Sequence, residues 1–244
     1  MATETLISFI VPVYNEELNI AGVLRNLYRV LDAHPQWRSE VIVVEDGSRD
    51  DSRKVILGEV KKYSNTRVIL HERNMGYTAS LKDGIRAAQG KYVMYIGADE
   101  EFDSSELPLF MDLLLDHGHG RADVVLGVRW QRNAYELFRF FLSVIYIFLL
   151  NFMFKLRIND YNWSQAWPRE LLEKVQLHSK SLFVLPEIII RAHDLNYRIK
   201  EVPSNHRGRQ AGKSSVNLRI MTHALLEAIQ FWFYRKSPRY SSTR

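Results

Sequence analysis

The chain has 244 residues, of which 46% are hydrophobic, and it is long enough for one sizeable α/β domain or two small ones, of which we expect a single core. It contains no cysteine, which excludes disulfides, thiolate metal sites and cysteine nucleophiles and leaves carboxylates, histidines and hydroxyls for any chemistry. The net charge of +5 is unevenly divided, because residues 1–130 carry 15 Lys and Arg against 20 Asp and Glu, whereas residues 131–244 carry 18 against 8. The basic second part favours an anionic membrane surface or a phosphorylated partner.

Apolar runs of strand length alternate with helical patterns in the first half of the chain. Strands are predicted at Leu6–Val13, Val41–Val44, Arg67–Leu70, Tyr92–Ile96 and Asp123–Val128. Helices are predicted at Glu16–Leu31 with Asn15 as N-cap, at Asp51–Tyr63 after Asp50, at Thr78–Ala88 and at Glu106–Leu115. This order predicts an α/β fold with a mainly parallel central sheet and helices on both faces.

An apolar segment, Leu137–Phe154, follows these elements. It has nearly the length that spans a bilayer and contains only Arg139 as a charge. Polar residues recur at multiples of four, at Arg139, Ser143, Asn151 and Lys155. This stripe favours a helical segment over residues 135–157 that lies in the membrane interface, while packing against the sheet or a partner and spanning the bilayer stay open.

The rest of the chain has a mixed pattern. It predicts short helices at Pro168–Gln176 and Pro186–Asp194, a strand at Tyr197–Pro203, a basic loop at His206–Ser215 and an amphipathic helix at Val216–Tyr234. Residues 235–244 form a basic tail that we predict to be disordered. We expect one structural domain, with halves at residues 1–130 and 131–234.

Two predicted strands end in carboxylates. Val41–Val44 leads into Glu45 and Asp46, and Tyr92–Ile96 leads into Asp99 and Glu101. In open α/β sheets, ligands bind outside the carboxyl ends of the strands, so these side chains predict one polar site. Carboxylate oxygens are the ligands that Mg²⁺ or Mn²⁺ prefers when the cation is shared with a diphosphate.

The first strand ends in an aromatic and acidic loop. Tyr14 could stack on a base while Glu16 accepts hydrogen bonds from the base or ribose, or Asn15 and Glu16 could merely cap a helix. Because Asp46 on the next strand is also available to a base or ribose, we favour nucleotide binding.

A series of short motifs runs through nearly the whole chain: V-P-V-Y-N-E-E (11–17), V-V-E-D-G-S-R-D-D-S (43–52), R-N-M-G-Y (73–77), A-D-E-E (98–101), G-V-R-W (127–130), Asp160 before W-S-Q-A-W (163–167), E-V-P (201–203) and G-K-S (212–214). In this order, the motifs resemble those of family-2 glycosyltransferases with the A-type nucleotide-diphospho-sugar transferase fold. The sequence is most similar to the dolichol-phosphate mannose synthase group of polyprenyl-phosphate glycosyltransferases.

The resemblance implies site residues by position. The nucleotide is expected at Pro12, Tyr14, Glu16, Asp46, Ala98 and Asp99, and the metal, Mg²⁺ or Mn²⁺, at Asp99 and Glu101. Phosphate or acceptor contacts are expected from Arg129, Arg207, Arg209, Lys213 and Ser214. Asp160 matches an aspartate near the transferred sugar, so the expected catalytic residues are Asp160, Asp99 and Arg129.

Two departures from the group's pattern concern the metal and the acceptor. Gly97 stands where the first aspartate of an Asp-Ala-Asp motif is usual, and Glu101 stands where a glutamine is usual, so charge is kept while geometry changes. The stretch Trp163–Trp167 replaces a usual Ser-Gly-Phe-Arg/Lys stretch, which leaves the sugar and acceptor open.

The resemblance implies an inverting transfer of a hexose from a nucleotide-diphospho-sugar, bound by residues 1–130, to a polyprenyl phosphate, bound by residues 131–234. The enzyme is then expected to be cytoplasmic and peripheral on a membrane, with a membrane-anchoring protein as a further partner and no nucleic-acid partner. Two alternatives stay open: a hydroxyl acceptor on a glycan or lipid-linked saccharide, and a non-catalytic regulatory protein with a degraded metal site. A phosphate acceptor needs no strong base, whereas a hydroxyl acceptor requires Asp160 to take its proton.

Overall fold

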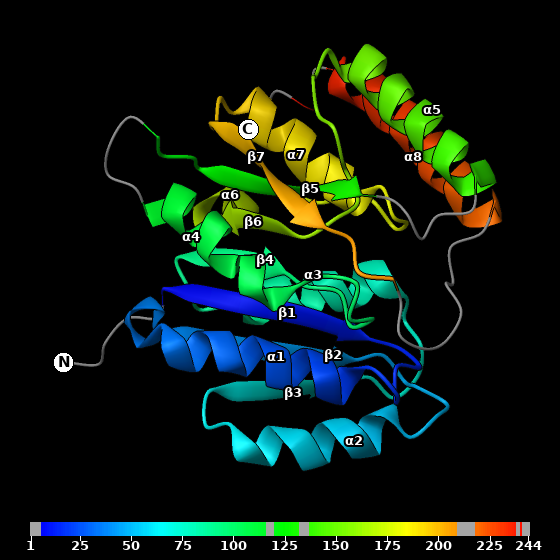
Figure 1. Cartoon of the computed structure of the whole chain (residues 1–244). Coiled ribbons are helices and arrows are strands. Elements are labelled where there is room, and N and C mark those ends of the chain that lie inside the picture. The colour runs from blue at the N-terminus through cyan, green and yellow to red at the C-terminus, as the bar shows by residue number, and fades with distance from the viewer. Residues whose placement is uncertain (1–5, 116–119, 132–136, 209–217, 238–239, 241–244) are drawn as a thin grey trace.

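The computed structural model describes residues 6–115, 120–131, 137–208, 218–237 and 240. Within them, one sheet has seven strands in the order β3-β2-β1-β4-β6-β5-β7 (Figure 1). The strands are β1 (Ile7–Val13), β2 (Ser39–Glu45), β3 (Thr66–Leu70), β4 (Tyr92–Tyr95), β5 (Val124–Gln131), β6 (Gln165–Pro168) and β7 (Ile199–Asn205). Only the strand pairs that involve β6 are antiparallel among those described, so the predicted mainly parallel sheet is confirmed.

Helices cover both faces of the sheet because side chains alternate along each strand. Phe9 and Val11 enter one hydrophobic core, whereas Ile10 between them enters a second core on the opposite face. The first core is covered by α1 (Ile20–Ala33), α2 (Ser52–Glu59) and α4 (Leu107–Leu115). The second is covered by α3 (Tyr77–Ala87), α5 (Leu137–Phe154), α6 (Arg169–Lys174), α7 (Val184–Asp194) and α8 (Leu218–Arg235).

Two local predictions are wrong, and one strand was not predicted. Asn15 does not cap the first helix, because it has a φ of +55° and α1 begins at Ile20, after Asn19. The second helix begins at Ser52, with Asp51 at the N-cap position where Asp50 was expected. The sequence pattern also fails to predict β6, because all its residues are buried and such a strand shows no polar alternation.

The helices α5 and α8 lie side by side along one side of the molecule (Figure 1). The rings of Phe154 and Phe231 hold them together with a centroid distance of 6.1 Å. The inner side of α5 is buried through Tyr146 and Leu150. Asn151 also faces the protein, since its side chain forms hydrogen bonds of 2.9 and 3.0 Å with the backbone of Ile158. At Asn151, the predicted polar stripe therefore faces the protein and not water.

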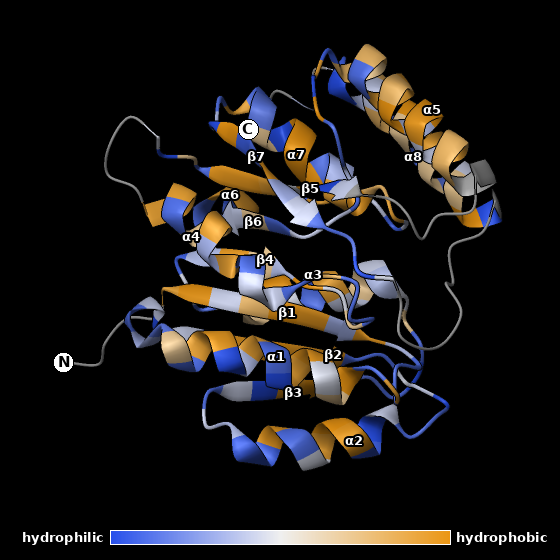
Figure 2. Ribbon diagram, in the orientation of Figure 1, coloured by the Kyte–Doolittle hydropathy of each residue, from blue (hydrophilic) through white to orange (hydrophobic). Residues whose placement is uncertain are grey.

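The outer side of α5 is apolar, as Figure 2 shows, and exposed apolar residues of α8 lie among polar ones. Phe148 is 67% exposed and Phe152 is 76% exposed. We call the following exposed residues the α5–α8 face: Phe141, Val144, Ile145, Phe148 and Phe152 of α5, with Leu226, Ile229 and Phe233 of α8. Within the described ranges, no helix is long and apolar enough to cross a membrane.

Part of the predicted disordered tail belongs to the fold. Arg235 ends α8 and forms an ion pair with Asp194. Tyr240 is buried, and its hydroxyl donates to the same carboxylate at 2.5 Å. The prediction of disorder therefore does not hold for these two residues, and residues 238–239 and 241–244 lie outside the described part.

Candidate active site

The loops after β1 and β2 are joined side to side at the carboxyl edge of the sheet. Backbone amides of each loop donate to side chains of the other: Asn15 N to Ser48 Oγ (3.1 Å), Glu16 N to Ser52 Oγ (2.7 Å), Glu17 N to Asp50 Oδ2 (3.2 Å), Arg49 N to Asn15 Oδ1 (2.8 Å) and Asp51 N to Glu17 Oε2 (2.7 Å). This network fixes the loop that carries Tyr14 and Glu16 beside Asp46. Pro12 lies in register with Val44 on the neighbouring strand, so the predicted nucleotide residues of both strands share one edge.

Glu45, the last residue of β2, is fully buried and supports the same loop. Its Oε1 accepts from Ser48 N at 2.5 Å, and its Oε2 accepts from Arg53 Nε at 2.6 Å. Burial acts to raise the pKa of Glu45, but the hydrogen bonds from Ser48 and Arg53 outweigh it and hold the pKa below its usual value. Glu45 is therefore an ionised structural anchor.

Asp46 is buried and faces the turn that precedes α3. Its Oδ1 accepts from Met75 N and its Oδ2 from Gly76 N, both at 2.8 Å. Gly76 has a φ of +91° and stands at the N-cap position of α3. The carboxylate predicted to contact the nucleotide thus also ties β2 to the R-N-M-G-Y motif.

Gly47 allows the backbone of that motif to approach β2. It has a φ of +66°, and a Cβ atom there would lie 2.4 Å from the carbonyl carbon of Arg73. We expect Gly47→Ala to lower the free energy of unfolding by roughly 2 kcal/mol or more, through left-handed strain and this clash. Urea unfolding measures the change.

Gly58 provides the matched control, since it lies inside α2 and a Cβ atom there would meet nothing within 4 Å. Gly58→Ala is expected to stabilise the fold by about 0.5 to 1 kcal/mol. Equal effects of the two substitutions would contradict the close approach at Gly47.

The predicted metal segment follows β4 directly. Ala98 is buried, Asp99 is half-buried, and Asp99 Oδ1 accepts from Glu101 N at 3.3 Å. Burial raises the pKa of Tyr95 well above its ordinary value, and the carboxylates of Asp99 and Glu101 raise it further, while Arg129 opposes them. The charges of the metal segment and of the predicted phosphate-binding arginine therefore both act on the Tyr95 hydroxyl.

The end of β7 pairs with the metal segment. His206 forms an isolated antiparallel bridge with Phe102, and its Nε2 lies 3.1 Å from Glu101 Oε2. Arg207 N donates to Glu101 O at 3.0 Å, and the Arg207 guanidinium pairs with Asp103. These contacts bring the start of the basic loop to the predicted metal residues.

Arg129 and Asp160 form a buried two-point ion pair. Arg129 Nε donates to Asp160 Oδ2 at 2.6 Å, and its second contact, to Oδ1, is 2.8 Å long. The Asp160 side chain is 1% exposed. The guanidinium also lies 4.8 Å from the ring centroid of Trp163, whose Nε1 donates to Ser204 Oγ at 2.7 Å. Two of the three predicted catalytic residues, Arg129 and Asp160, are therefore bonded to each other.

Three predicted phosphate or acceptor residues, Arg209, Lys213 and Ser214, lie outside the described residues. Sequence reasoning missed His71, which bridges Asp46 and α3. It follows β3 directly, so the strand-end rule that singles out Asp46 and Asp99 applies to it as well.

The predicted metal segment offers few ligands for a divalent metal ion, but they are of the kind that such an ion prefers. In the part of the chain that the structure describes, no group of three His, Asp or Glu side chains converges to hold a metal ion. Asp99 and Glu101 supply carboxylate oxygens from one turn. Mg²⁺ is commonly bound by one or two carboxylates together with substrate phosphates and water, so the two residues fit a cation shared with a diphosphate.

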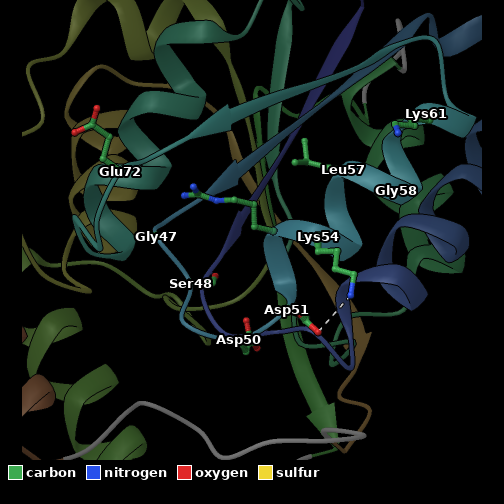
Figure 3. A pocket seen from close by; sticks show the side chains of 10 residues that line it. Gly47, Ser48, Asp50, Asp51, Lys54, Leu57, Gly58, Lys61 and Glu72 are labelled. Atoms are coloured by element: carbon green, nitrogen blue, oxygen red, sulfur yellow. Dashed lines mark ion pairs between the residues drawn. The ribbon is translucent and has the colours of Figure 1, made fainter.

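A separate open pocket of about 650 Å³ lies between the β2 loop and α2 (Figure 3). Gly47, Ser48, Arg53 and Lys54 line it, and Lys54 Nζ lies 3.8 Å from Asp51 Oδ2. None of Asp46, Asp99 or Arg129 lines this pocket, so it is not the candidate site.

The overall fold matches solved structures of nucleotide-sugar enzymes. Glucosyl-3-phosphoglycerate synthase from Mycobacterium tuberculosis in complex with uridine-diphosphate has a TM-score of 0.71 at 20% identity, over 95% of this chain and 80% of that one. Its complex with Mn²⁺, uridine-diphosphate and phosphoglyceric acid gives a TM-score of 0.68 at 20% identity, over 93% and 78%. The protein thus has the A-type fold of nucleotide-diphospho-sugar transferases.

Residues 8–176 match the family described as Glycosyl transferase family 2. The chain belongs to this family and is a glycosyltransferase. It is 23% identical, over 94% of its length and 67% of the relative's, to dodecaprenyl-phosphate galacturonate synthase of Rhizobium johnstonii. It is 27% identical, over 93% of its length and 68% of the relative's, to undecaprenyl-phosphate 4-deoxy-4-formamido-L-arabinose transferase of Edwardsiella ictaluri. The chain spans about two thirds of the length of these two relatives.

Proposed function

We propose that this protein transfers a sugar from a nucleotide-diphospho-sugar to a polyprenyl phosphate at a membrane surface. The names of its relatives support this acceptor, and a dolichyl-phosphate beta-glucosyltransferase of Trichomonas vaginalis is 34% identical over 39% of this chain and 31% of the relative. The nucleotide lies against Pro12, Tyr14, Glu16 and Asp46, and its diphosphate faces Asp99 and Arg129.

The burial of Asp160 and its ion pair with Arg129 are the observation on which we choose between the two acceptors. Its two carboxylate oxygens are engaged by Arg129 at 2.6 and 2.8 Å, and the side chain is nearly inaccessible. A hydroxyl acceptor would require this carboxylate to take a proton, which would cost the ion pair in a buried place. A phosphate acceptor is already ionised near neutral pH, so it needs no such base.

The reaction is then a direct displacement. A phosphate oxygen of the acceptor forms a bond to the anomeric carbon, while the bond from that carbon to the nucleoside diphosphate breaks and its electron pair leaves with the diphosphate. Arg129 stabilises the charge on the leaving group. A cation held by Asp99 and Glu101 would supply further neutralisation of the diphosphate.

A binding and transfer assay tests the proposal. Calorimetry with UDP-glucose, GDP-mannose and UDP-N-acetylglucosamine, with and without Mn²⁺, identifies the donor. Transfer is then measured to a polyprenyl phosphate and, as a matched control, to the polyprenol without phosphate. We expect transfer only to the phosphate; transfer to a saccharide hydroxyl with none to the lipid phosphate would overturn it.

The α5–α8 face is suited to rest on the membrane that contains the acceptor. Its exposed side chains on α5 recur at helical spacing, from Phe141 through Phe148 to Phe152. The chain from residue 131 onward carries 18 Lys and Arg against 8 Asp and Glu, which favours anionic lipid. A membrane-anchoring protein stays a second expected occupant of this face.

We expect Phe148→Glu with Phe152→Glu to weaken binding to phosphatidylglycerol vesicles about 100-fold, because two aromatic side chains lose burial in the bilayer. Vesicle co-sedimentation measures this. Leu109→Glu is the matched control, since Leu109 is an exposed apolar residue on α4, away from α5 and α8. If the wild-type protein does not co-sediment with the vesicles, the membrane role of this face is wrong.

Trp130 follows Arg129 on β5, and we propose that it contacts the lipid acceptor. The β5–β7 register shifts between Arg129 and Gln131, so a bulge turns Trp130 outward, where it is 78% exposed. We expect Trp130→Ala to raise the KM for the lipid acceptor about tenfold with kcat and donor KM unchanged, since an aromatic contact surface is lost. Steady-state kinetics with both substrates varied checks this, and a change in donor KM alone would contradict it.

A further inference from the structure

The imidazole of His71 lies between two carboxylates that come from different elements. Its Nδ1 is 2.7 Å from Asp46 Oδ1, at the end of β2, and its Nε2 is 3.0 Å from Asp83 Oδ2, on α3. The side chain is 10% exposed. An ionised carboxylate can only accept, so the ring nitrogen that bonds Asp46 is the donor in that hydrogen bond.

The backbone of His71 is fixed as well. Its N–H donates to Glu45 O at 2.9 Å, and its carbonyl accepts from Arg53 Nη2 at 2.6 Å. Arg53 is itself held by the buried Glu45. The charged groups around the ring are therefore Asp46 from β2, Asp83 from α3, Arg86 paired with Asp83, and Arg53 from α2.

Asp46 links His71 to the turn before α3. The carboxylate that accepts from His71 also accepts the amides of Met75 and Gly76. Without a donor at Nδ1, Oδ1 would keep only the bond from Met75 N and Oδ2 the bond from Gly76 N, so the carboxylate would be held less tightly about its terminal torsion, which has a broad well.

We infer that His71 is a positioning residue for the donor site: its Nδ1–H fixes the Asp46 carboxylate, and through it the Met75–Gly76 turn. This inference deepens the proposed function, since it rests on nucleotide binding beside Asp46. His71 contacts no reacting atom in this scheme and acts only through Asp46.

Two substitutions separate the two ring contacts. The amide nitrogen of asparagine can occupy the place of Nδ1, whereas that of glutamine can occupy the place of Nε2. His71→Asn should keep the bond to Asp46 and lose the one to Asp83, and His71→Gln should do the reverse. The donor KM, or the donor Kd by calorimetry, is expected to rise about tenfold in His71→Gln with kcat little changed, and less than threefold in His71→Asn. Equal weakening by both variants, or no weakening by either, would overturn the inference.

A second readout does not depend on any ligand. Hydrogen exchange of the Met75 and Gly76 amides is expected to be faster in His71→Gln than in the wild type and His71→Asn. Asp83→Asn serves as the control and should leave both amides protected. If no nucleotide-sugar binds the wild type, the proposed function fails while this exchange pattern still tests His71.

A measurement on the unaltered protein covers the case in which the variants do not fold. The proton on His71 Nδ1 should be observable by ¹⁵N NMR as a slowly exchanging resonance, because it is held against a buried carboxylate. Its absence, with the resonances of the Met75 and Gly76 amides present and protected, would overturn the inference.

Discussion

Asp160→Ala is expected to lower the free energy of unfolding by about 3 to 5 kcal/mol and to abolish transfer, because it leaves the Arg129 guanidinium buried and without its carboxylate. The starting geometry is a two-point pair with contacts of 2.6 and 2.8 Å, with the Arg129 side chain 8% exposed and the Asp160 side chain 1% exposed. Chemical denaturation measures the first effect, and the transfer assay measures the second.

A double substitution separates stability from catalysis. Buried ion pairs replaced by apolar side chains of similar volume are often neutral in stability, so Arg129→Leu with Asp160→Leu should regain much of the stability that Asp160→Ala loses. We expect no recovery of transfer, since the positive charge that we propose to face the leaving diphosphate is gone. A double variant that transfers sugar at the wild-type rate would reduce the pair to a purely structural role.

Arg129→Lys is a milder probe of the same pair. Lysine keeps the charge but loses both the forked contact with Asp160 and the planar stacking on Trp163. We expect transfer to fall about 100-fold while donor binding through the Asp46 loops is kept, a loss of about 3 kcal/mol in transition-state stabilisation.

The sequence places Asp46 and Asp99 at one sheet edge because apolar runs reveal where buried parallel strands end. It does not predict which groups the side chains of Asp46 and Asp99 contact. The Asp46 carboxylate bonds the amides of Met75 and Gly76, which are 29 and 30 residues away, and no local pattern encodes such contacts.

The Arg129–Asp160 pair illustrates the same limit. The motifs identify both residues, but they are 31 positions apart and meet because β6 inserts antiparallel between β4 and β5. The pattern of Gln165–Pro168 gives no alternation, so the strand that brings the pair together is not predicted.

Asn15 is a polar residue after a strand, which also suits an N-cap, yet its side chain bonds Arg49 N in the neighbouring loop.

Asp99→Asn is expected to reduce transfer about 100- to 1,000-fold and to remove any strengthening of donor binding by Mn²⁺, because a neutral amide is a poor ligand for a hard cation. Calorimetry of the donor with and without Mn²⁺ and the transfer assay measure the two effects. The matched control is Glu100→Gln, one residue away, because the Glu100 carboxylate lies against α1, where a Cβ atom on Gly22 would come within 1.6 Å of it. Glu100→Gln should leave the metal dependence unchanged.

The opposite change is expected from Gly97→Asp. Gly97 is not among the described glycines with positive φ, so its backbone accepts an L-residue. A Cβ atom there would lie 2.9 Å from Asp99 Oδ1, the end of a flexible side chain that can shift. A third carboxylate at the turn should tighten Mn²⁺ binding about tenfold, or about 1.4 kcal/mol.

Together these variants decide whether the turn after β4 holds a cation. Weaker metal dependence in Asp99→Asn and tighter Mn²⁺ binding in Gly97→Asp would place the cation at Asp99 and Glu101. Full transfer by Asp99→Asn in the presence of a chelator would show instead that Arg129 and the basic loop alone neutralise the leaving diphosphate. In that case, the glycine at position 97 would mark a site in which arginine and lysine charge has replaced the metal.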